Sequence, residues 1–165
     1  MAFTREWHCG LILRVDDRLL HGQVIFGWGV SGPAKKIWLI NDRVAENAKE
    51  RELYLTALPQ QFHGGILTLK EALLYWSSGY KPSECTLGIV ETCEDLAKLI
   101  RGGIQPEEIH LGAIARADDR QPVSDCVALS ETERGALRIV KDAGYTPLLL
   151  DLHNSQPVPF NLNKV

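Results

Sequence analysis

Short apolar runs alternate along the chain with longer segments in which apolar residues recur at helical spacing. Several short runs are leucine-rich or β-branched over their whole length, as expected for strands buried on both faces of a sheet. Such alternation is typical of a parallel sheet covered by helices on both faces. The pattern predicts a single α/β domain with a mostly parallel sheet of about seven strands. The predicted strands span residues 11–15, 36–40, 64–67, 85–90, 108–111, 126–128 and 146–150.

Capping sequences mark the start of three intervening helices. Each places a hydroxyl at the N-cap and a carboxylate three residues later. Two of these helices end at glycine, Gly102-Gly103 and Gly144, the residue that best tolerates a left-handed terminal conformation. A further helix is predicted over residues 44–58, because its apolar residues share one face, and Pro59 stops it. The residues on that face are Val44, Ala48, Leu55 and Leu58. The capping pairs are Thr68 with Glu71, Thr92 with Asp95, and Ser130 with Glu133.

The C-terminal part of the chain has weaker periodicity. Pro147 cannot donate a ladder hydrogen bond, so the final predicted strand is expected at an edge of the sheet. The segment after Asp151 contains Pro157 and Pro159 and has no clear period. We expect an irregular tail from about residue 152.

Composition limits the class of protein. A chain of 165 residues with 45% hydrophobic and 24% charged residues has material for one ordinary core, so we expect one domain over residues 1–165. A net charge of -3 gives no general attraction to nucleic acid or anionic lipid. The chain shows neither a long apolar run nor the order of a signal peptide. We therefore expect a cytoplasmic protein.

The cysteines do not suggest a metal or disulfide framework. They are widely spaced, form no C-x-x-C pair and lie mostly in apolar segments. We expect buried, reduced thiols that pack as small hydrophobic side chains. They are Cys9, Cys85, Cys93 and Cys126.

The densest chemistry follows the first predicted strand. Residues 14–24 read RVDDRLLHGQV and contain two carboxylates, two guanidiniums and one imidazole. Leu20, Val24 and Trp28 recur at a spacing of four, so a helix running to about Trp28 can pack on the sheet while its N-terminal end stays open. In open parallel sheets, ligands usually bind outside the carboxyl ends of the strands, where this loop lies.

This loop has features that suit phosphate. Exposed N–H groups at a helix start favour an anion, and Gly22 lets another molecule approach the backbone closely. Arg14 and Arg18 could add bidentate contacts to phosphate oxygens.

His21 is the candidate phosphate acceptor. It must attack as neutral imidazole, and a carboxylate bonded to its other nitrogen would hold the tautomer and stabilise the positive ring after attack. Asp16 or Asp17 could serve. The alternative is a solvated turn with local ion pairs, and metal binding here would need further ligands from elsewhere.

The string RVDDRLLHGQV closely resembles the first-loop motif R-[IV]-D-D-R-[LF]-[IL]-H-G-Q-V of the IIB components (EIIB) of mannose/fructose/sorbose-class sugar phosphotransferase systems (PTS). The resemblance continues through Trp28, through IWLINDRVAEN at residues 37–47 and through LIRGGI at residues 99–104. It covers most of residues 11–150. It implies a mostly parallel α/β sheet, in agreement with the strand pattern, and a transferase of phosphorus-containing groups.

The resemblance also implies roles and partners. His21 matches the phosphorylated histidine, which takes phosphate from a IIA protein and passes it to sugar at membrane IIC and IID subunits. The protein would associate peripherally with that permease, without a metal or small cofactor. A homo-oligomer is compatible with the sequence. The residues matched around the histidine, as phosphate-binding or orienting groups, are Arg14, Asp16, Asp17, Arg18, Gly22 and Gln23.

Two segments depart from the family pattern. Where the family usually has a G-G-M turn after the fifth strand, residues 111–116 read LGAIAR, and a charged run Asp118-Asp119-Arg120 follows. The stretch from Leu152 also matches poorly. These departures motivate an alternative, a regulatory or interaction module that keeps the phosphorylatable loop without feeding a sugar permease. A domain that only binds phosphate reversibly is a third hypothesis.

The other histidines lack such surroundings and are expected to be surface or structural residues. The tryptophans lie beside apolar positions and are expected in the core or at a partner surface. These residues are His8, His63, His110 and His153, and Trp7, Trp28, Trp38 and Trp76.

Overall fold

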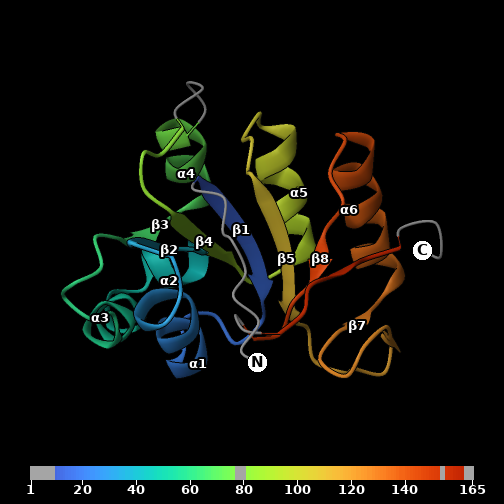
Figure 1. Cartoon of the computed structure of the whole chain (residues 1–165), viewed down its shortest axis with the longest axis horizontal. Helices are drawn as coiled ribbons and strands as arrows, with labels where there is room; N and C mark the ends of the chain where they lie inside the picture. The colour runs from blue at the N-terminus through green and yellow to red at the C-terminus, as the bar shows by residue number, and fades with distance from the viewer. Residues whose placement is uncertain (1–9, 77–80, 153–154, 162–165) are drawn as a thin grey trace.

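The computed structural model describes residues 10–76, 81–152 and 155–161. A seven-stranded sheet in the order β3-β2-β4-β1-β5-β8-β9 forms its centre (Figure 1). All neighbouring strands are parallel except β8 and β9, which are antiparallel. The predicted α/β class with a mostly parallel sheet is confirmed. The strands are β1 (Leu11–Asp16), β2 (Lys36–Ile40), β3 (Gly65–Leu67), β4 (Thr86–Val90), β5 (Glu108–Ala113), β8 (Leu148–Leu149) and β9 (Val158–Pro159).

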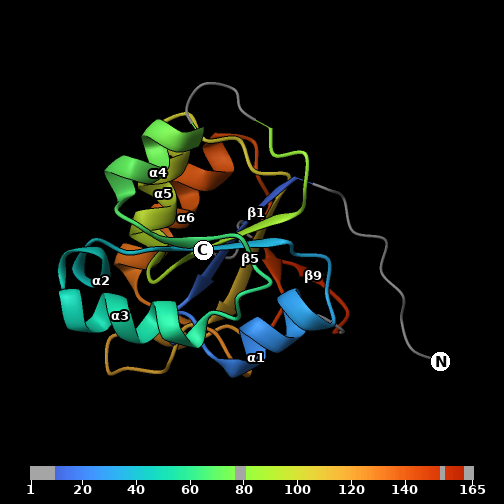
Figure 2. The ribbon, with the colours of Figure 1, turned by 90° about the vertical axis from the view of Figure 1, so that its left-hand side faces the viewer.

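Helices cover both faces of the sheet (Figure 2). One face carries α4 (Leu69–Trp76), α5 (Cys93–Arg101) and α6 (Glu131–Asp142). The other carries the remaining helical segments, whose residues pack in a second apolar cluster. These are α1 (Gly22–Val24), the π-helix η1 (Ile25–Val30), α2 (Asp42–Glu46) and α3 (Ala48–Ala57).

Alternation along β1 decides which side chains reach each face. Leu13 and Val15 pack on the side of α4, α5 and α6, whereas Ile12 packs on the other side. Because side chains two residues apart in a strand share a face, Arg14 and Asp16 lie on the same face of the sheet as Ile12. The strand thus carries two charged side chains under α1 and η1, where both are buried.

The predicted helix caps are confirmed. The hydroxyls of Thr68, Thr92 and Ser130 accept hydrogen bonds from backbone N–H groups three residues on, at 3.1, 3.1 and 3.3 Å. Helices α5 and α6 are followed by Gly103 at φ 91° and Gly144 at φ 93°, the left-handed conformation for which glycine is suited.

The single helix predicted over residues 44–58 is wrong. The segment forms α2 and α3, separated by Asn47 at φ -95° and ψ 107°. The Asn47 side chain accepts hydrogen bonds from the N–H groups of Lys49 and Glu50. Asparagine is a strong N-cap residue, so it starts a new helix here although the apolar pattern continues.

The helix predicted to reach about Trp28 begins with α1 and continues as η1 to Val30. The Ser31 N–H bonds to the Phe26 carbonyl, five residues back, at 2.8 Å. Leu20, Val24 and Trp28 are buried as the spacing predicts. The wider π turn keeps this apolar stripe on the sheet.

Three C-terminal predictions need correction. The strand after Pro147 does not lie at the edge, because β8 pairs with β5 on one side and β9 on the other. The tail expected to be irregular from residue 152 contains β9, and the following Phe160 is buried. The segment 126–128 does not join the main sheet. Its region forms β7 (Ala128–Leu129), which pairs with β6 (Gln121–Pro122) in a separate ribbon.

No helix within the described ranges is both long enough and apolar enough to cross a membrane. Cys85 and Cys93 are buried and Cys126 is half-buried. Burial raises the pKa of Cys93, which keeps it protonated. Cys9 lies outside the described residues.

The capping box of α6 gives a stability test. Ser130→Ala should lower the free energy of unfolding by about 1 kcal/mol, because the substitution leaves the Glu133 N–H without its side-chain acceptor. Urea unfolding followed by circular dichroism measures the change. Thr132→Ala, on the exposed first turn of the same helix, is the matched control, and an equal loss in both variants would contradict the assignment.

Candidate functional site

The backbone at the carboxyl end of β1 sets up the candidate site. The pairing of β1 with β5 shifts register between Val15 and Asp16. The chain then turns through Leu19, which has φ 58°, a costly conformation for leucine. Burial of the Leu19 side chain and its N–H bond to the Asp16 carbonyl at 3.0 Å hold the turn. His21 follows in extended conformation as the N-cap residue of α1.

Asp16 is the centre of the cluster. Its carboxylate is fully buried and accepts hydrogen bonds from Arg14 Nε and Nη2 at 3.2 and 3.0 Å. It also accepts from the backbone N–H, Nε and Nη2 of Arg18, at 3.1, 3.1 and 3.2 Å. His21 Nε2 lies 3.3 Å from Asp16 Oδ2. One carboxylate therefore joins both guanidiniums to the imidazole.

Arg14 is a buried cation fixed from several sides. Nη1 donates to the Leu150 carbonyl at 2.6 Å, and Nη2 donates to the Asp151 carbonyl at 2.9 Å. The guanidinium carbon lies 4.3 Å from the ring centroid of Trp28, a cation–π arrangement. A Cβ on Gly112 would overlap this guanidinium. Glycine is thus required where β5 passes Arg14.

The charges of the cluster depend on one another. Burial by itself would raise the pKa of Asp16, but hydrogen bonds from His21 and Arg18, with the charges of Arg14 and Arg18, hold that pKa well below its ordinary value of 3.8. Burial lowers the pKa of Arg14, and the Asp16 charge opposes this. The hydrogen bond to Asp16 raises the pKa of Arg18. Asp16 is therefore a carboxylate that only accepts hydrogen bonds.

Asp17 contacts the turn after β5, whereas Asp16 contacts the two arginines and His21. Its N–H donates to the Ala113 carbonyl at 2.9 Å, and its Oδ2 accepts from the Ala115 N–H at 2.6 Å. Asp17 therefore ties the first loop to the turn after β5. The sequence left either Asp16 or Asp17 as the partner of His21, and in the structure Asp16 contacts the imidazole.

The His21 ring has one engaged and one available nitrogen. Since Asp16 is an acceptor, Nε2 carries the proton in the neutral ring and Nδ1 keeps a lone pair. Within the described part of the chain, Nδ1 has no hydrogen-bond partner. The side chain is 20% exposed, so the ring held by Asp16 is partly open to solvent.

Gly22 and Gln23 lie beside His21 on the exposed start of α1. Gln23 Oε1 accepts from Arg18 Nη1 at 2.9 Å. No atom lies within 4 Å of the position that a Gly22 Cβ would take. The structure therefore brings together Arg14, Asp16, Arg18, His21 and Gln23, with Gly22 at the open rim, while Asp17 anchors the neighbouring turn.

Sequence reasoning missed the contribution of the chain near residue 150. The carbonyls of Leu150 and Asp151 satisfy Arg14, and the Asp151 carboxylate lies 3.7 Å from Arg18 Nη2. Backbone acceptors leave no mark in the residue types, so the sequence holds no signal for them. Gly112 was the available signal, since this glycine lies in a central strand and stands against Arg14.

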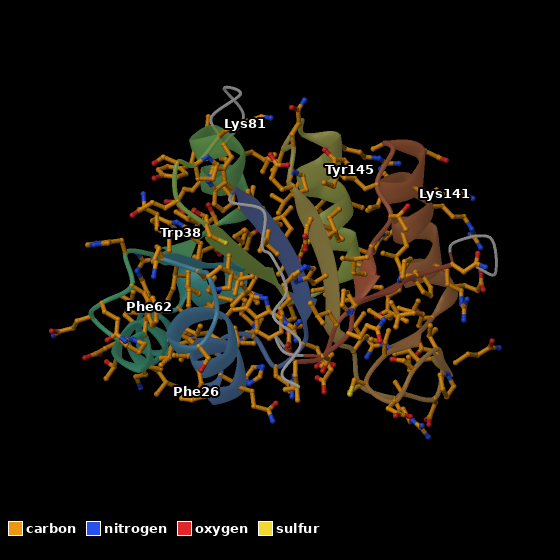
Figure 3. The ribbon with its side chains drawn as sticks, viewed as in Figure 1. Phe26, Trp38, Phe62, Lys81, Lys141 and Tyr145 are labelled. Atoms are coloured by element: carbon orange, nitrogen blue, oxygen red, sulfur yellow. The ribbon has the colours of Figure 1, made fainter. Side chains whose placement is uncertain are left out.

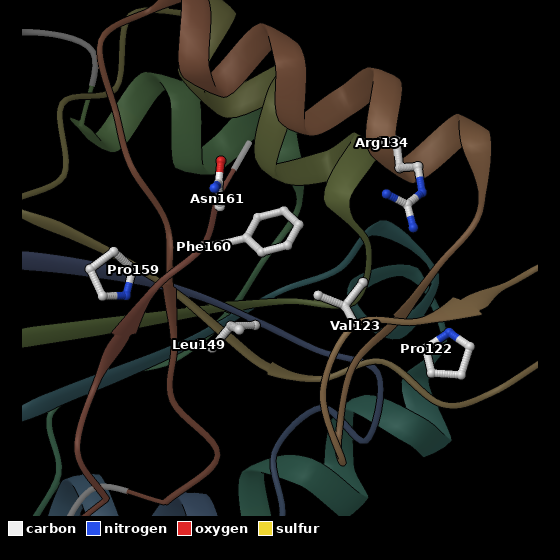
Figure 4. A pocket seen from close by; sticks show the side chains of 7 residues that line it. All are labelled: Pro122, Val123, Arg134, Leu149, Pro159, Phe160 and Asn161. Carbon is white, nitrogen blue, oxygen red and sulfur yellow. The ribbon is translucent and has the colours of Figure 1, made fainter. Parts of the chain in front are cut away.

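One hollow of the surface is separate from the Asp16 cluster and another adjoins it. A cavity of about 360 Å³ lies beside α6, lined by residues that include Val123, Leu149 and Phe160 (Figure 4). Its lining shares no residue with the Asp16 cluster. A hollow of about 220 Å³ adjoins the cluster, because Gly112 and Asp151 line it. Within the described ranges, no three His, Cys, Asp or Glu side chains are grouped to hold a metal ion.

The other predicted structural residues follow expectation where the structure describes them. His110 is buried, with Nε2 2.7 Å from Glu108, and His63 is exposed. Trp28 and Trp76 are in the core, and Trp38 is half-buried and packs against it. The remaining members His8, His153 and Trp7 lie outside the described residues.

The model of the family described as "PTS system sorbose subfamily IIB component" matches residues 11–159. The chain belongs to this family. It is thus an EIIB component of a sugar PTS, a class of phosphotransferase that works with IIA and IIC/IID partners. The match runs from β1 to β9 and includes the whole Asp16 cluster.

Relatives and solved structures agree with this membership. The sorbose-specific EIIB component of Klebsiella pneumoniae is 25% identical over 133 residues, 81% of each chain. The fructose-specific EIIB component of Bacillus subtilis is 24% identical over 135 residues, 81% of this chain and 82% of the relative. The crystal structure of the IIBSor domain of the K. pneumoniae sorbose permease superposes with TM-score 0.81 at 24% identity, covering 93% and 94% of the two chains. It shares the fold.

Removing the Asp16 charge should destabilise the protein in a pH-dependent manner. At pH 7, Asp16→Asn should cost about 3–5 kcal/mol, because it leaves Arg14 buried without its anion. The stability from the lowered Asp16 pKa is fully present above the ordinary value of 3.8 and is lost as pH falls through the folded-state pKa. The gap between wild type and variant should therefore narrow below about pH 4.

Urea unfolding at a series of pH values measures this gap. Asp17→Asn is the control, since an amide oxygen can still accept from the Ala115 N–H. It should cost less than about 1 kcal/mol. A gap for Asp16→Asn that stays constant into acid would exclude the lowered pKa as its cause.

Gly112→Ala tests the close packing on Arg14. The added methyl should displace the buried guanidinium and lower the free energy of unfolding by about 1–3 kcal/mol. Gly135→Ala is the matched control, because its Cβ would meet nothing within 4 Å and lies inside α6. That control should stabilise the protein by up to about 1 kcal/mol. Thermal unfolding that ranks the variants in the opposite order would refute the packing argument.

Proposed function

We propose that this EIIB component is a phosphocarrier in which His21 takes a phosphoryl group from a phosphohistidine of a IIA protein and passes it to sugar at a IIC/IID permease. The observation that carries the proposal is the arrangement of the His21 ring. Asp16 Oδ2 lies 3.3 Å from Nε2, so Nδ1 is the nitrogen left for phosphate on a side chain that is 20% exposed.

The arrangement suits both halves of the transfer. In the first, the Nδ1 lone pair forms the new N–P bond while the donor N–P bond breaks and its electron pair returns to the donor ring. In the second, a sugar hydroxyl oxygen attacks phosphorus, its proton passes to water, and the His21 N–P electron pair returns to Nδ1. The buried Asp16 carboxylate stabilises the positively charged ring between these steps.

Cations beside the ring favour the phosphoryl group. Arg18 is 40% exposed and carries a planar guanidinium that suits phosphate oxygens. The open rim at Gly22 leaves room for a second protein to approach. In phosphoryl transfer, positioning and charge neutralisation supply most of the catalysis, and this cluster offers both.

The helix that starts at His21 offers a docking surface for the partners. Phe26 is 60% exposed and Val30 53% exposed, and Phe26 lies on the outer side of η1 (Figure 3). Exposed aromatic side chains are common anchors in protein interfaces. We propose that residues 1–165 act as one cytoplasmic domain that meets the IIA protein and the permease through this end of the sheet.

Phosphorylation by a complete relay tests the role of His21. Incubation with phosphorylated IIA protein, followed by intact mass measurement, should show one acid-labile phosphate, which His21→Ala abolishes. His63→Ala, at an exposed histidine, is the control and should keep the phosphate. An unlabelled wild-type protein, or a label retained in His21→Ala, would refute the proposal.

Adding membranes that contain IIC and IID subunits extends the same experiment to the acceptor. Sugar phosphate should form only with protein that has His21. A labelled protein that never yields sugar phosphate would favour the regulatory alternative.

A further inference from the structure

Asp151 contacts both arginines of the cluster in different ways. Its backbone carbonyl accepts from Arg14 Nη2 at 2.9 Å. Its carboxylate lies 3.7 Å from Arg18 Nη2, and this side-chain pair is partly exposed at both ends, 40% for Arg18 and 38% for Asp151. The residue therefore fixes one cation by its backbone and faces the other with its charge.

The two cations differ in freedom. Arg14 is buried and bonded to Asp16 and to two backbone carbonyls. Arg18 contacts Asp16 from a partly exposed position, so its guanidinium is the one that can turn toward a group on the His21 ring. Any anion that faces Arg18 competes with such a group.

We propose that the Asp151 carboxylate competes with the phosphoryl group on His21 for Arg18, and thereby weakens the phosphorylated form enough to favour onward transfer. The inference rests on the proposed function of His21. In the equilibrium concerned, the donor N–P bond breaks as the His21 N–P bond forms, with no change in the number of protons. Asp151 touches none of the reacting atoms and is a positioning residue that acts through Arg18.

A carrier needs this kind of balance. The group must move onto His21 and then leave it, so a site that bound phosphate too tightly would stop after the first step. An ion pair at a partly exposed site changes an equilibrium by a factor of up to about five. That range is enough to adjust the balance without preventing phosphorylation.

Asp151→Asn tests the proposal. Asparagine has nearly the same size and keeps the backbone carbonyl that Arg14 uses, so only the charge is lost. At equilibrium with phosphorylated IIA protein, the ratio of phosphorylated to free His21 should rise about two- to fivefold. Transfer to sugar in permease membranes should slow by a similar factor. Loss of a merely structural contact would lower both quantities.

Matched variants identify the cause. Asp125→Asn makes the same charge change in the same hollow, and Asp125 forms no ion pair with any residue in the described ranges. It should leave the ratio unchanged, and Asp151→Glu should behave like wild type. In an Arg18→Gln background, with donor in excess so that the labelled fraction is measurable, Asp151→Asn should have no effect.

Other results would overturn the inference. These are an unchanged or lowered ratio in Asp151→Asn, an equal rise in Asp125→Asn, or a rise that persists without Arg18. The proposed function fails separately, because it requires phosphate on the wild-type protein. Labelled wild type with no response to Asp151→Asn would refute only the role of Asp151.

Discussion

The buried carboxylate of Asp16 is the constraint around which this end of the sheet is built. An ion removed from water is costly unless its remaining acceptor sites are used. Here two guanidiniums, a backbone N–H and an imidazole use them. The same contacts that make the burial tolerable also fix the orientation of His21. Stability and chemistry at this site therefore depend on one set of bonds.

Arg14 carries this constraint into the rest of the fold. The guanidinium lies under Trp28 from η1, beside Gly112 from β5 and against carbonyls that follow β8. Three elements that are distant in sequence must therefore be in place before Arg14 has its full complement of partners. The end of the sheet that carries the candidate site is consequently part of the core.

Local signals explain what the sequence could predict. Apolar runs predicted the strands of the main sheet except β9, and hydroxyl–carboxylate pairs predicted the starts of α4, α5 and α6, because caps and burial act over a few residues. The motif around His21 is equally local, so the sequence alone named most residues that the structure brings together at the candidate site. The break at Asn47 was missed because the apolar pattern runs across it.

Long-range pairing explains what the sequence could not predict. The antiparallel partner of β8 depends on the return of the chain near Val158, which no local pattern signals. The choice between Asp16 and Asp17 depends on a register shift against β5. The acceptors at Leu150 and Asp151 are backbone atoms, which every residue has, so side-chain chemistry could not identify them.

The bond between Arg14 and the Leu150 carbonyl spans 136 residues, which has a consequence for biosynthesis. A ribosome makes Arg14 and Asp16 among the first residues of the domain, yet the last acceptors of Arg14 emerge near its end. During translation these charges must remain hydrated, because the interior that accommodates them does not yet exist. A nascent chain that stops before β8 therefore lacks the contacts that fix Arg14, although it already contains His21.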